Sequence, residues 1–274
     1  MKPSPFKHIK TVDFGTDEVI VRRLMLQLSD LTQPLGNKKD ITEKMLGIYY
    51  NEIARKLLEC RRIELEISKY VNEVLVKYSN SGIDAFVING TLHTPSKPNL
   101  ESIATNLLYI FKQVLKSQIK FMNLFYSTDI REARWDKMKN YLVSKGYKEM
   151  MIYKCINFHY SWIETVCQFR NDYEHTNKDD PFVLKDFEIV DNTIVSPKWG
   201  NTKYGIMDID ETCRKLINNM IHFGEEIFTL CLSDFVLTKP FIIVEQRVIA
   251  SQDSKENRFT LSLNQEILKK IHGV

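Results

Sequence analysis

The sequence predicts a mainly α-helical protein: a bundle of four to five long helices with two small β-hairpins toward the C-terminus. Glycine and proline are scarce, with 10 and 8 residues in a chain of 274, so breaks in the helices should be few. Apolar residues also recur at steps of three and four over long stretches, which is the helical period. With 43% hydrophobic and 27% charged residues, the chain can bury a sizeable core.

The first part of the chain, residues 1–39, is expected to form an irregular arm and a short helix. Thr16 or Asp17 can cap this helix, because their short polar side chains accept bonds from the first free backbone N–H groups. The helix should run to about Leu31. Pro34 and Gly36 then predict a break before the next helix.

The helical domain is expected over residues 40–235. Its first helix covers residues 40–78, either as one long helix or as two helices joined by a kink. A loop over residues 79–98, anchored to the core by residues 85–88, leads to a second long helix at 99–126, so the two helices form an antiparallel hairpin. We expect further helices at residues 132–144, ending at Gly146, at 148–175 and at 208–235.

Two β-hairpins complete the prediction. The first is an insertion at about residues 182–196, where β-branched residues flank an Asp191-Asn192 turn. The second pairs residues 241–244 with 258–263, and a short helix begins at Asn264. We expect this C-terminal part, residues 236–274, to pack on the same domain, because no linker separates it from the helices.

Several classes of protein are excluded by missing features. The sequence has no Gly-x-Gly-x-x-Gly, phosphate loop, His-Glu-x-x-His or Gly-x-Ser-x-Gly motif. Its longest apolar run, residues 107–111, is far shorter than the ~20 residues of a membrane-spanning helix. The five cysteines are odd in number and form no Cys-x-x-Cys pair. We therefore expect free thiols and a cytoplasmic protein with no membrane partner.

One pair of metal-ligating residue types occurs in the fourth long helix. Cys155 and His159 are four residues apart, so they share a helix face and could hold one metal ion. Two ligands do not make a site, however, and both residues fall on the apolar face. We therefore predict that they pack in the core, and we expect no metal and no cofactor.

The end of the same helix carries a different group of residues, Arg170, Asn171 and His175. Asn171 and His175 share a helix face, so the Asn oxygen could hold one ring nitrogen of the histidine and leave the other free. A guanidinium binds phosphate through a planar fork of donors, and an imidazole transfers protons near neutral pH. These groups suffice to cleave RNA without a metal. One takes the 2′-hydroxyl proton and the other stabilises the charge that develops on the phosphate.

The segment Arg170-Asn171-x-x-x-His175 resembles the Arg-x(4–6)-His signature of the HEPN superfamily. The resemblance extends over roughly residues 40–235, since HEPN domains are helical bundles with the signature toward the end of a late helix. It implies that Arg170 and His175 are catalytic, with Asn171 in support. It also implies a homodimer in which two signatures face each other, and a metal-independent ribonuclease of the kind found among toxins and defence effectors.

Charge is distributed unevenly around this segment. Residues 171–191 hold seven acidic and two basic residues, a net charge of −5, which repels a phosphate backbone. Residues 112–154 hold ten basic and four acidic residues, a net charge of +6. Aromatic residues are interleaved there, a combination suited to single-stranded RNA; they are Phe121, Phe125, Tyr126, Trp135 and Tyr141.

The sequence therefore predicts a homodimeric endoribonuclease that acts on RNA, with Arg170, Asn171 and His175 in the site. A second interpretation is a non-catalytic HEPN-like module that binds an antitoxin, another protein or a nucleotide. A third is a helical scaffold in which the motif is accidental. Exposure of Arg170 and His175 in one cleft would favour the first interpretation, whereas burial of His175 or its pairing only with Asp172 would favour the third.

Overall fold

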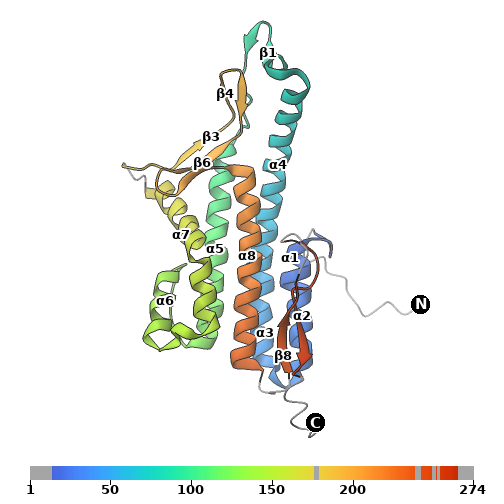
Figure 1. Ribbon diagram of the computed structural model, residues 1–274, viewed down its shortest axis with the longest axis vertical. Helices are drawn as coiled ribbons and strands as arrows, with labels where there is room; N and C mark the ends of the chain where they lie inside the picture. Colours follow the sequence, from blue (N-terminus) through green and yellow to red (C-terminus); the bar gives the residue numbers. More distant parts are fainter. Residues whose placement is uncertain (1–13, 176–178, 238–241, 249–250, 252–253, 265–274) are drawn as a thin grey trace, which may run out of the picture.

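Three long helices form the axis of the molecule: α4 (Arg55–Ser81), α5 (Leu100–Tyr126) and α8 (Ile209–Cys231) (Figure 1). On one side of α8 lie α6 (Trp135–Ser144) and α7 (Met151–His175), and on the other lie α1 (Val19–Val21) and α2 (Gln27–Thr32). The computed structural model describes residues 14–175, 179–237, 242–248, 251 and 254–264. The predicted mainly helical class, with small strand pairs toward the C-terminus, is confirmed.

The first predicted helix is one continuous helical path that is slightly longer than expected. It begins with α3 (Lys39–Ile48), widens into a π-helical segment, Tyr49–Ala54, and continues as α4. A π-helical turn holds more residues than an α-helical turn, so the path widens without a break. The helix ends at Ser81 and is followed by Gly82, whose φ of +57° is a conformation that favours glycine.

The N-terminal helical segment starts later than predicted. Glu18, rather than Thr16 or Asp17, is the N-cap of α1, and its carboxylate accepts from the backbone N–H of Ile20. A π-helical segment, Arg22–Leu26, joins α1 to α2. The predicted break at residues 33–37 is a 3₁₀ turn, Gln33–Lys38.

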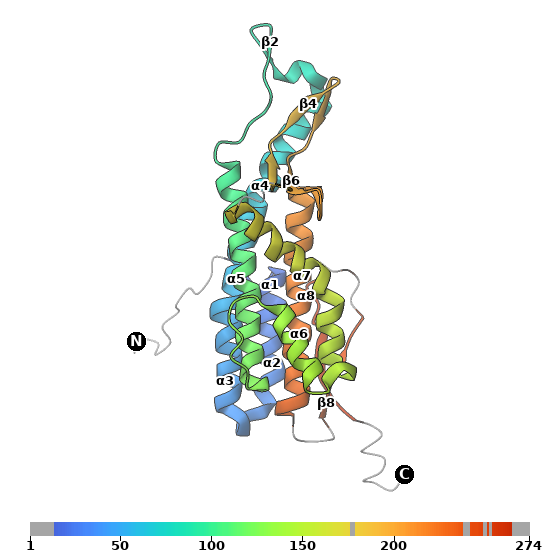
Figure 2. The same ribbon diagram turned by 90° about the vertical axis from the view of Figure 1, so that its left-hand side faces the viewer.

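A small hairpin that was not predicted lies beyond α4, at the end of the molecule farthest from the described termini (Figures 1 and 2). Its strands are β1 (Val87–Ile88) and β2 (Thr91–Leu92), and Asn89 and Gly90 both have positive φ in the turn. Phe86 is buried, but Val87 and Ile88 are exposed. The expected core anchor at residues 85–88 is therefore limited to Phe86 and the half-buried Ala85.

The next two helices begin three residues later than predicted. α6 starts at Trp135, and Gly146 follows its end with a φ of +76°, as expected of a helix-terminating glycine. A 3₁₀ turn, Tyr147–Glu149, precedes α7, because Met150 has an extended backbone with a ψ of 148°. α7 ends at His175, as predicted.

The insertion before α8 contains more strand than the sequence indicated. The predicted hairpin is present as β4 (Glu188–Val190) and β5 (Thr193–Val195), with positive φ at Asp191 and Asn192. The strand before it, β3 (Val183–Lys185), does not pair within this hairpin. It pairs with β6 (Lys198–Asn201), which pairs with β7 (Gly205–Asp208), so these three strands form an antiparallel sheet.

The predicted C-terminal hairpin is present as β8 (Ile242–Gln246) and β9 (Phe259–Leu263). It packs beside α2, where the backbone N–H of Phe259 donates to the Gln27 side chain at 2.9 Å. The sequence predicted a short helix beginning at Asn264, and the residues after Asn264 lie outside the described part of the chain.

Aromatic side chains fill the centre of the bundle. Tyr49 makes edge contacts with Phe121 of α5 and Phe228 of α8, with ring centroids 4.9 Å apart in both pairs. Its hydroxyl donates to the carbonyl of Gly224 at 2.6 Å, so this polar atom is satisfied inside the core. Among the described residues, no helix has the length and apolar character needed to cross a membrane.

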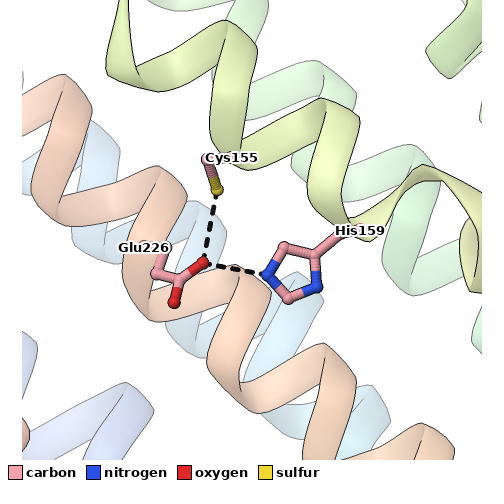
Figure 3. A group of neighbouring side chains, drawn as sticks. All are labelled: Cys155, His159 and Glu226. Carbon is pink, nitrogen blue, oxygen red and sulfur yellow. Dashed lines mark hydrogen bonds and ion pairs between the residues drawn. The ribbon is translucent and has the colours of Figure 1, made fainter.

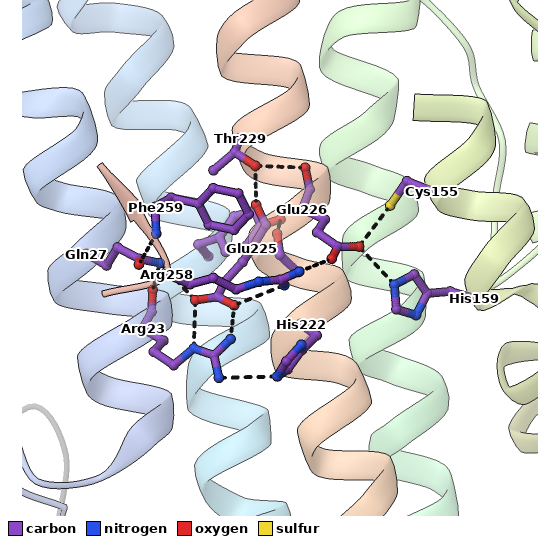
Figure 4. Close-up of polar contacts among 12 residues, drawn as sticks. Arg23, Gln27, Cys155, His159, His222, Glu225, Glu226, Thr229, Arg258 and Phe259 are labelled. Carbon is purple, nitrogen blue, oxygen red and sulfur yellow. Dashed lines mark hydrogen bonds and ion pairs between the residues drawn. The ribbon is translucent and has the colours of Figure 1, made fainter. Parts of the chain in front are cut away.

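A buried ion pair joins the N-terminal helical segment to α8. Arg23 and Glu225 are both fully buried, and the Arg23 Nε donates to a Glu225 carboxylate oxygen at 2.8 Å (Figure 4). Gln27 donates to the same oxygen at 2.8 Å. Arg258, next to strand β9, lies 3.7 Å from the other oxygen. One carboxylate on α8 therefore contacts both the N-terminal helical segment and the residue that precedes β9.

Replacing Arg23 by methionine should cost about 3–5 kcal/mol of unfolding free energy, because it leaves a carboxylate buried without its main partner. Adding Glu225→Gln should recover part of this loss, since a neutral amide is less costly to bury. Urea unfolding followed by circular dichroism measures both variants. Equal stability of the single and double variants would show that the charge of Glu225 is not the source of the cost.

Candidate functional site

The residues of the Arg-His motif occupy the upper end of α7, beside strands β3 and β6 (Figure 1). Phe169 and Asp172 face inward and are buried. Arg170 and Asn171 are half-buried, and His175 is exposed at the last residue of the helix. This order follows from the helical period, which turns neighbouring residues about 100° apart.

Arg170 is held on the surface of the helix by two neighbours. Its guanidinium forms an ion pair with Glu174, one turn later on α7, and lies 5.6 Å from the centre of the Tyr109 ring on α5. Burial lowers the pKa of Arg170 somewhat, but an arginine stays charged in a protein. Arg170 therefore bends toward Glu174 and α5 rather than toward His175.

Asn171 does not support His175 as expected. Its side-chain oxygen accepts a hydrogen bond from the Lys112 ammonium of α5 at 2.8 Å. The physical reason is that this side of α7 faces α5, where a cation is available to the oxygen. Lys112 therefore lies beside the motif and adds a basic residue to the group.

His175 is exposed, so the burial that would favour the scaffold interpretation is not observed. Within the described part of the chain, no side chain forms a hydrogen bond with its ring, and Asp172 bonds elsewhere. The Asp172 carboxylate accepts from Gln168 at 2.6 Å and from Asn201 of β6 at 2.8 Å. Asp172 therefore anchors the three-stranded sheet to α7, which is a structural role inside the motif.

Two features lie next to this helix end. Tyr109 is 47% exposed, so its ring is available on the surface beside Arg170. A polar cavity of about 670 Å³ is lined by Tyr173 of the motif and, from other elements, by Lys97, Ser102 and Asp186. His175 and Arg170 do not line it. The two predicted catalytic residues therefore share a helix end, and neither of them lines this cavity.

The expected RNA-binding stretch at residues 112–154 differs from the prediction. Phe121, Tyr126 and Trp135 are buried in the core, so these rings are not stacking surfaces for bases. Several cations of the stretch are paired with carboxylates, as in Lys116–Glu132 at 2.7 Å. The other such pairs are Lys120–Glu52, Arg131–Asp129, Arg134–Asp136 and Lys154–Glu149. Helical periodicity explains why aromatic and basic residues alternate in the sequence here: one face of α5 packs in the core and another face carries the charged residues.

A second polar group lies near the other end of α7 (Figure 3). Glu226 of α8 reaches between Cys155 and His159, and one of its oxygens lies 3.4 Å from the Cys155 sulfur and 2.9 Å from His159 Nε2. His159 is buried, as predicted, and the other two residues are half-buried. Glu226 was not among the residues predicted for a site; its signal in the sequence is an acidic pair, Glu225-Glu226, inside the apolar stretch of α8.

The hydrogen bonds around His159 indicate which of its two ring nitrogens carries the proton. The Trp162 indole, which can only donate, bonds to His159 Nδ1 at 3.0 Å. The ring proton must then be on Nε2, which donates it to Glu226. Burial raises the pKa of the Cys155 thiol, as does the charge of Glu226. Burial also raises the pKa of Glu226, but hydrogen bonds from His159 and Arg258 outweigh it and bring that pKa to about 2.

Comparisons with protein-family models, with curated proteins and with solved structures found no match. The function must therefore be inferred from the chemistry of these side chains. The motif end of α7 offers an exposed imidazole and two cations that are bound to Glu174 and Asn171, whereas the Cys155 end offers a sulfur, a buried nitrogen and an oxygen in one group.

Within the motif, Asp172 and His175 should respond differently to replacement by alanine. Asp172→Ala leaves the buried Asn201 amide without its acceptor, which should cost about 1–3 kcal/mol of unfolding free energy. His175→Ala should change it by less than about 0.5 kcal/mol, because the ring is exposed. Chemical denaturation measures both. A large loss for His175→Ala would mean that this residue is structural.

Proposed function

We propose that the protein is a metal-independent endoribonuclease of the HEPN type, with Arg170 and His175 as its catalytic residues. The observation that carries the proposal is the exposed His175 at the same end of α7 as Arg170, where Lys112 of α5 binds Asn171. The position of this end also agrees with the resemblance, because it closes the last long helix but one of a mainly helical bundle.

The reaction needs a base, an acid and a cation. The 2′-oxygen of the RNA forms a bond to phosphorus while the bond from phosphorus to the 5′-oxygen breaks. His175 accepts the 2′-hydroxyl proton, and the departing 5′-oxygen takes a proton from the His175 of a second copy. Arg170 binds the phosphate and stabilises the charge that develops on it. The products then carry 2′,3′-cyclic phosphate ends.

Glu174 regulates access to Arg170 in this proposal. In the free protein the Glu174 carboxylate forms an ion pair with the Arg170 guanidinium. An RNA phosphate must therefore displace this carboxylate before it can bind Arg170. Glu174→Gln removes that competitor. It should strengthen RNA binding by up to about fivefold, the range of a partly exposed ion pair. Fluorescence anisotropy with a labelled RNA measures this, and weaker binding by the variant would contradict the role of Glu174.

RNA cleavage by the purified protein should persist in the presence of a chelator. His175→Ala should reduce the rate by about 10²–10⁴-fold, the usual contribution of acid–base catalysis. Arg170→Lys should also be poor, because an ammonium lacks the planar fork of donors. His93→Ala is the matched control, since His93 is an exposed histidine away from the motif. If the wild type cuts no RNA, or cuts it equally well with both residues replaced, the non-catalytic binding module takes the place of this proposal.

The proposal requires a homodimer, since each chain supplies one histidine to a reaction that uses an acid and a base. We expect a two-fold dimer with the upper ends of the two α7 helices near the axis. Sedimentation at tens of micromolar, an order-of-magnitude choice for a non-obligate interface, should show a species of twice the chain mass. A chain that stays monomeric at that concentration would contradict this assembly.

A further inference from the structure

The group formed by Cys155, His159 and Glu226 is far from the motif and independent of the proposed function. Sixteen residues of α7 separate His159 from His175, a rise of about 24 Å. Among the described residues it is the one set of three or more His, Cys, Asp or Glu side chains with metal-binding geometry, and its ligand atoms all lie within 4.8 Å of one another. The sequence predicted only two of its members, and predicted them as core.

We propose that Cys155, His159 and Glu226 bind one zinc-type divalent cation, which ties α7 to α8. The ligand atoms are the Cys155 sulfur, His159 Nε2 and one carboxylate oxygen of Glu226. A thiolate with an imidazole selects zinc rather than magnesium or calcium, which prefer oxygen ligands. Three protein ligands leave a fourth tetrahedral position for water.

The distances fit a small tetrahedral ion. Zinc lies about 2.3 Å from sulfur and about 2.0 Å from oxygen, so a tetrahedral site places these two atoms about 3.5 Å apart. The Cys155 sulfur and the Glu226 oxygen are 3.4 Å apart. The His159 nitrogen lies 2.9 Å from the same oxygen, and all three ligand atoms lie within 4.8 Å of one another.

The fourth position is accessible from a cavity. A pocket of about 390 Å³ is lined by Cys155 and Glu226, and beside them by Met151, Phe158 and Gln246. Phe158 is 79% exposed, so the pocket opens to solvent beside its ring. His159 does not line the pocket and is buried behind it. A hydrated ion can therefore reach the sulfur and the carboxylate before it binds the nitrogen.

The carboxylate is already oriented for this role. Arg258 binds one oxygen of Glu226, and the other oxygen is the one that faces Cys155 and His159 (Figure 4). An ion would replace the two hydrogen bonds on that second oxygen and leave the contact to Arg258 in place. Hydrogen bonds from residues that do not bind the metal themselves, such as that of Arg258 here, hold a metal ligand in its orientation.

Binding moves two protons. The Cys155 thiol must lose its proton to solvent, and the His159 ring must shift its proton from Nε2 to Nδ1. The reaction therefore releases one proton for each ion bound. The shift breaks the hydrogen bond from the Trp162 indole, because Nδ1 can no longer accept it. The Trp162 hydrogen bond therefore opposes metal binding and lowers the affinity of the three ligands for the ion.

Titration with Co²⁺, a spectroscopic substitute for zinc, tests the proposal on the full chain. We expect a thiolate-to-cobalt charge-transfer band that saturates at one equivalent and disappears when Zn²⁺ is added. The band appears only when a cysteine thiolate binds the cobalt. It therefore distinguishes binding at this site from binding to surface carboxylates or histidines. Zn²⁺ should also raise the midpoint of thermal unfolding, since the ion binds the folded state.

Four variants locate the ion. Cys155→Ser should abolish the band, and His159→Gln should weaken Co²⁺ binding at least about tenfold. Cys167→Ser is the matched control, because Cys167 is another half-buried thiol on α7, and it should leave the band unchanged. Trp162→Phe should strengthen binding roughly two- to tenfold, the equivalent of one hydrogen bond that no longer has to be broken.

Circular dichroism of each variant without metal establishes that it is folded. The proposal is overturned if the folded wild type gives no thiolate band, if the band survives Cys155→Ser, or if Zn²⁺ leaves the unfolding midpoint unchanged. Weaker binding by Trp162→Phe would overturn the proton shift. RNA cleavage has no part in these readouts, so failure here is distinguishable from failure of the ribonuclease proposal.

Discussion

The packing of the N-terminal helical segment and of the C-terminal hairpin against α8 depends on the buried ion pair between Arg23 and Glu225. A carboxylate with no exposure to water is costly unless cations and donors surround it. Here Arg23 comes from the N-terminal helical segment, Gln27 from α2 and Arg258 from beside β9. Because all of them converge on one α8 residue, the first and last described parts of the chain meet at one place in the bundle.

The residue after this pair extends the arrangement to the other side of α8. Glu226 is turned about 100° from Glu225 along the helix, so it faces α7 while Glu225 faces α2. Arg258 contacts both carboxylates and lies between the two environments. Two adjacent acidic residues thus connect α2, α7, α8 and the C-terminal hairpin, and α8 is the element to which all of these attach.

Much of the fold could be predicted from local sequence, because the apolar period defines each long helix by itself. The turn at Asp191 and Asn192 and the helix end at Gly146 were also local signals, since each requires a left-handed backbone. Strands β6 and β7 were missed because Gly200 and Gly205 interrupt any alternation. Gly200 is required there, since a Cβ would lie 2.1 Å from the carbonyl oxygen of Gly205 on the paired strand.

The sites were predicted less completely, because their partners come from distant parts of the chain. The faces of α7 could be deduced from spacing, and His175 is exposed at the helix end. Spacing could not reveal that Asn171 would bind Lys112, 59 residues earlier, or that Glu226 would join His159, 67 residues earlier. Hydrophobic periodicity says which face of a helix is buried, but not which helix covers it.

Helix α7 also has a mechanical property that follows from its composition. It contains no proline or glycine and no π-helical turn over its 25 residues, so nothing in it acts as a hinge. Its midpoint is fixed in the core by Ile163 and Val166. α7 therefore connects the Cys155 group to His175 through one unbroken helix, about 36 Å along its path, which changes direction near its middle (Figure 2). No loop lies between the two groups, so a displacement at one of them passes to the other through a single element.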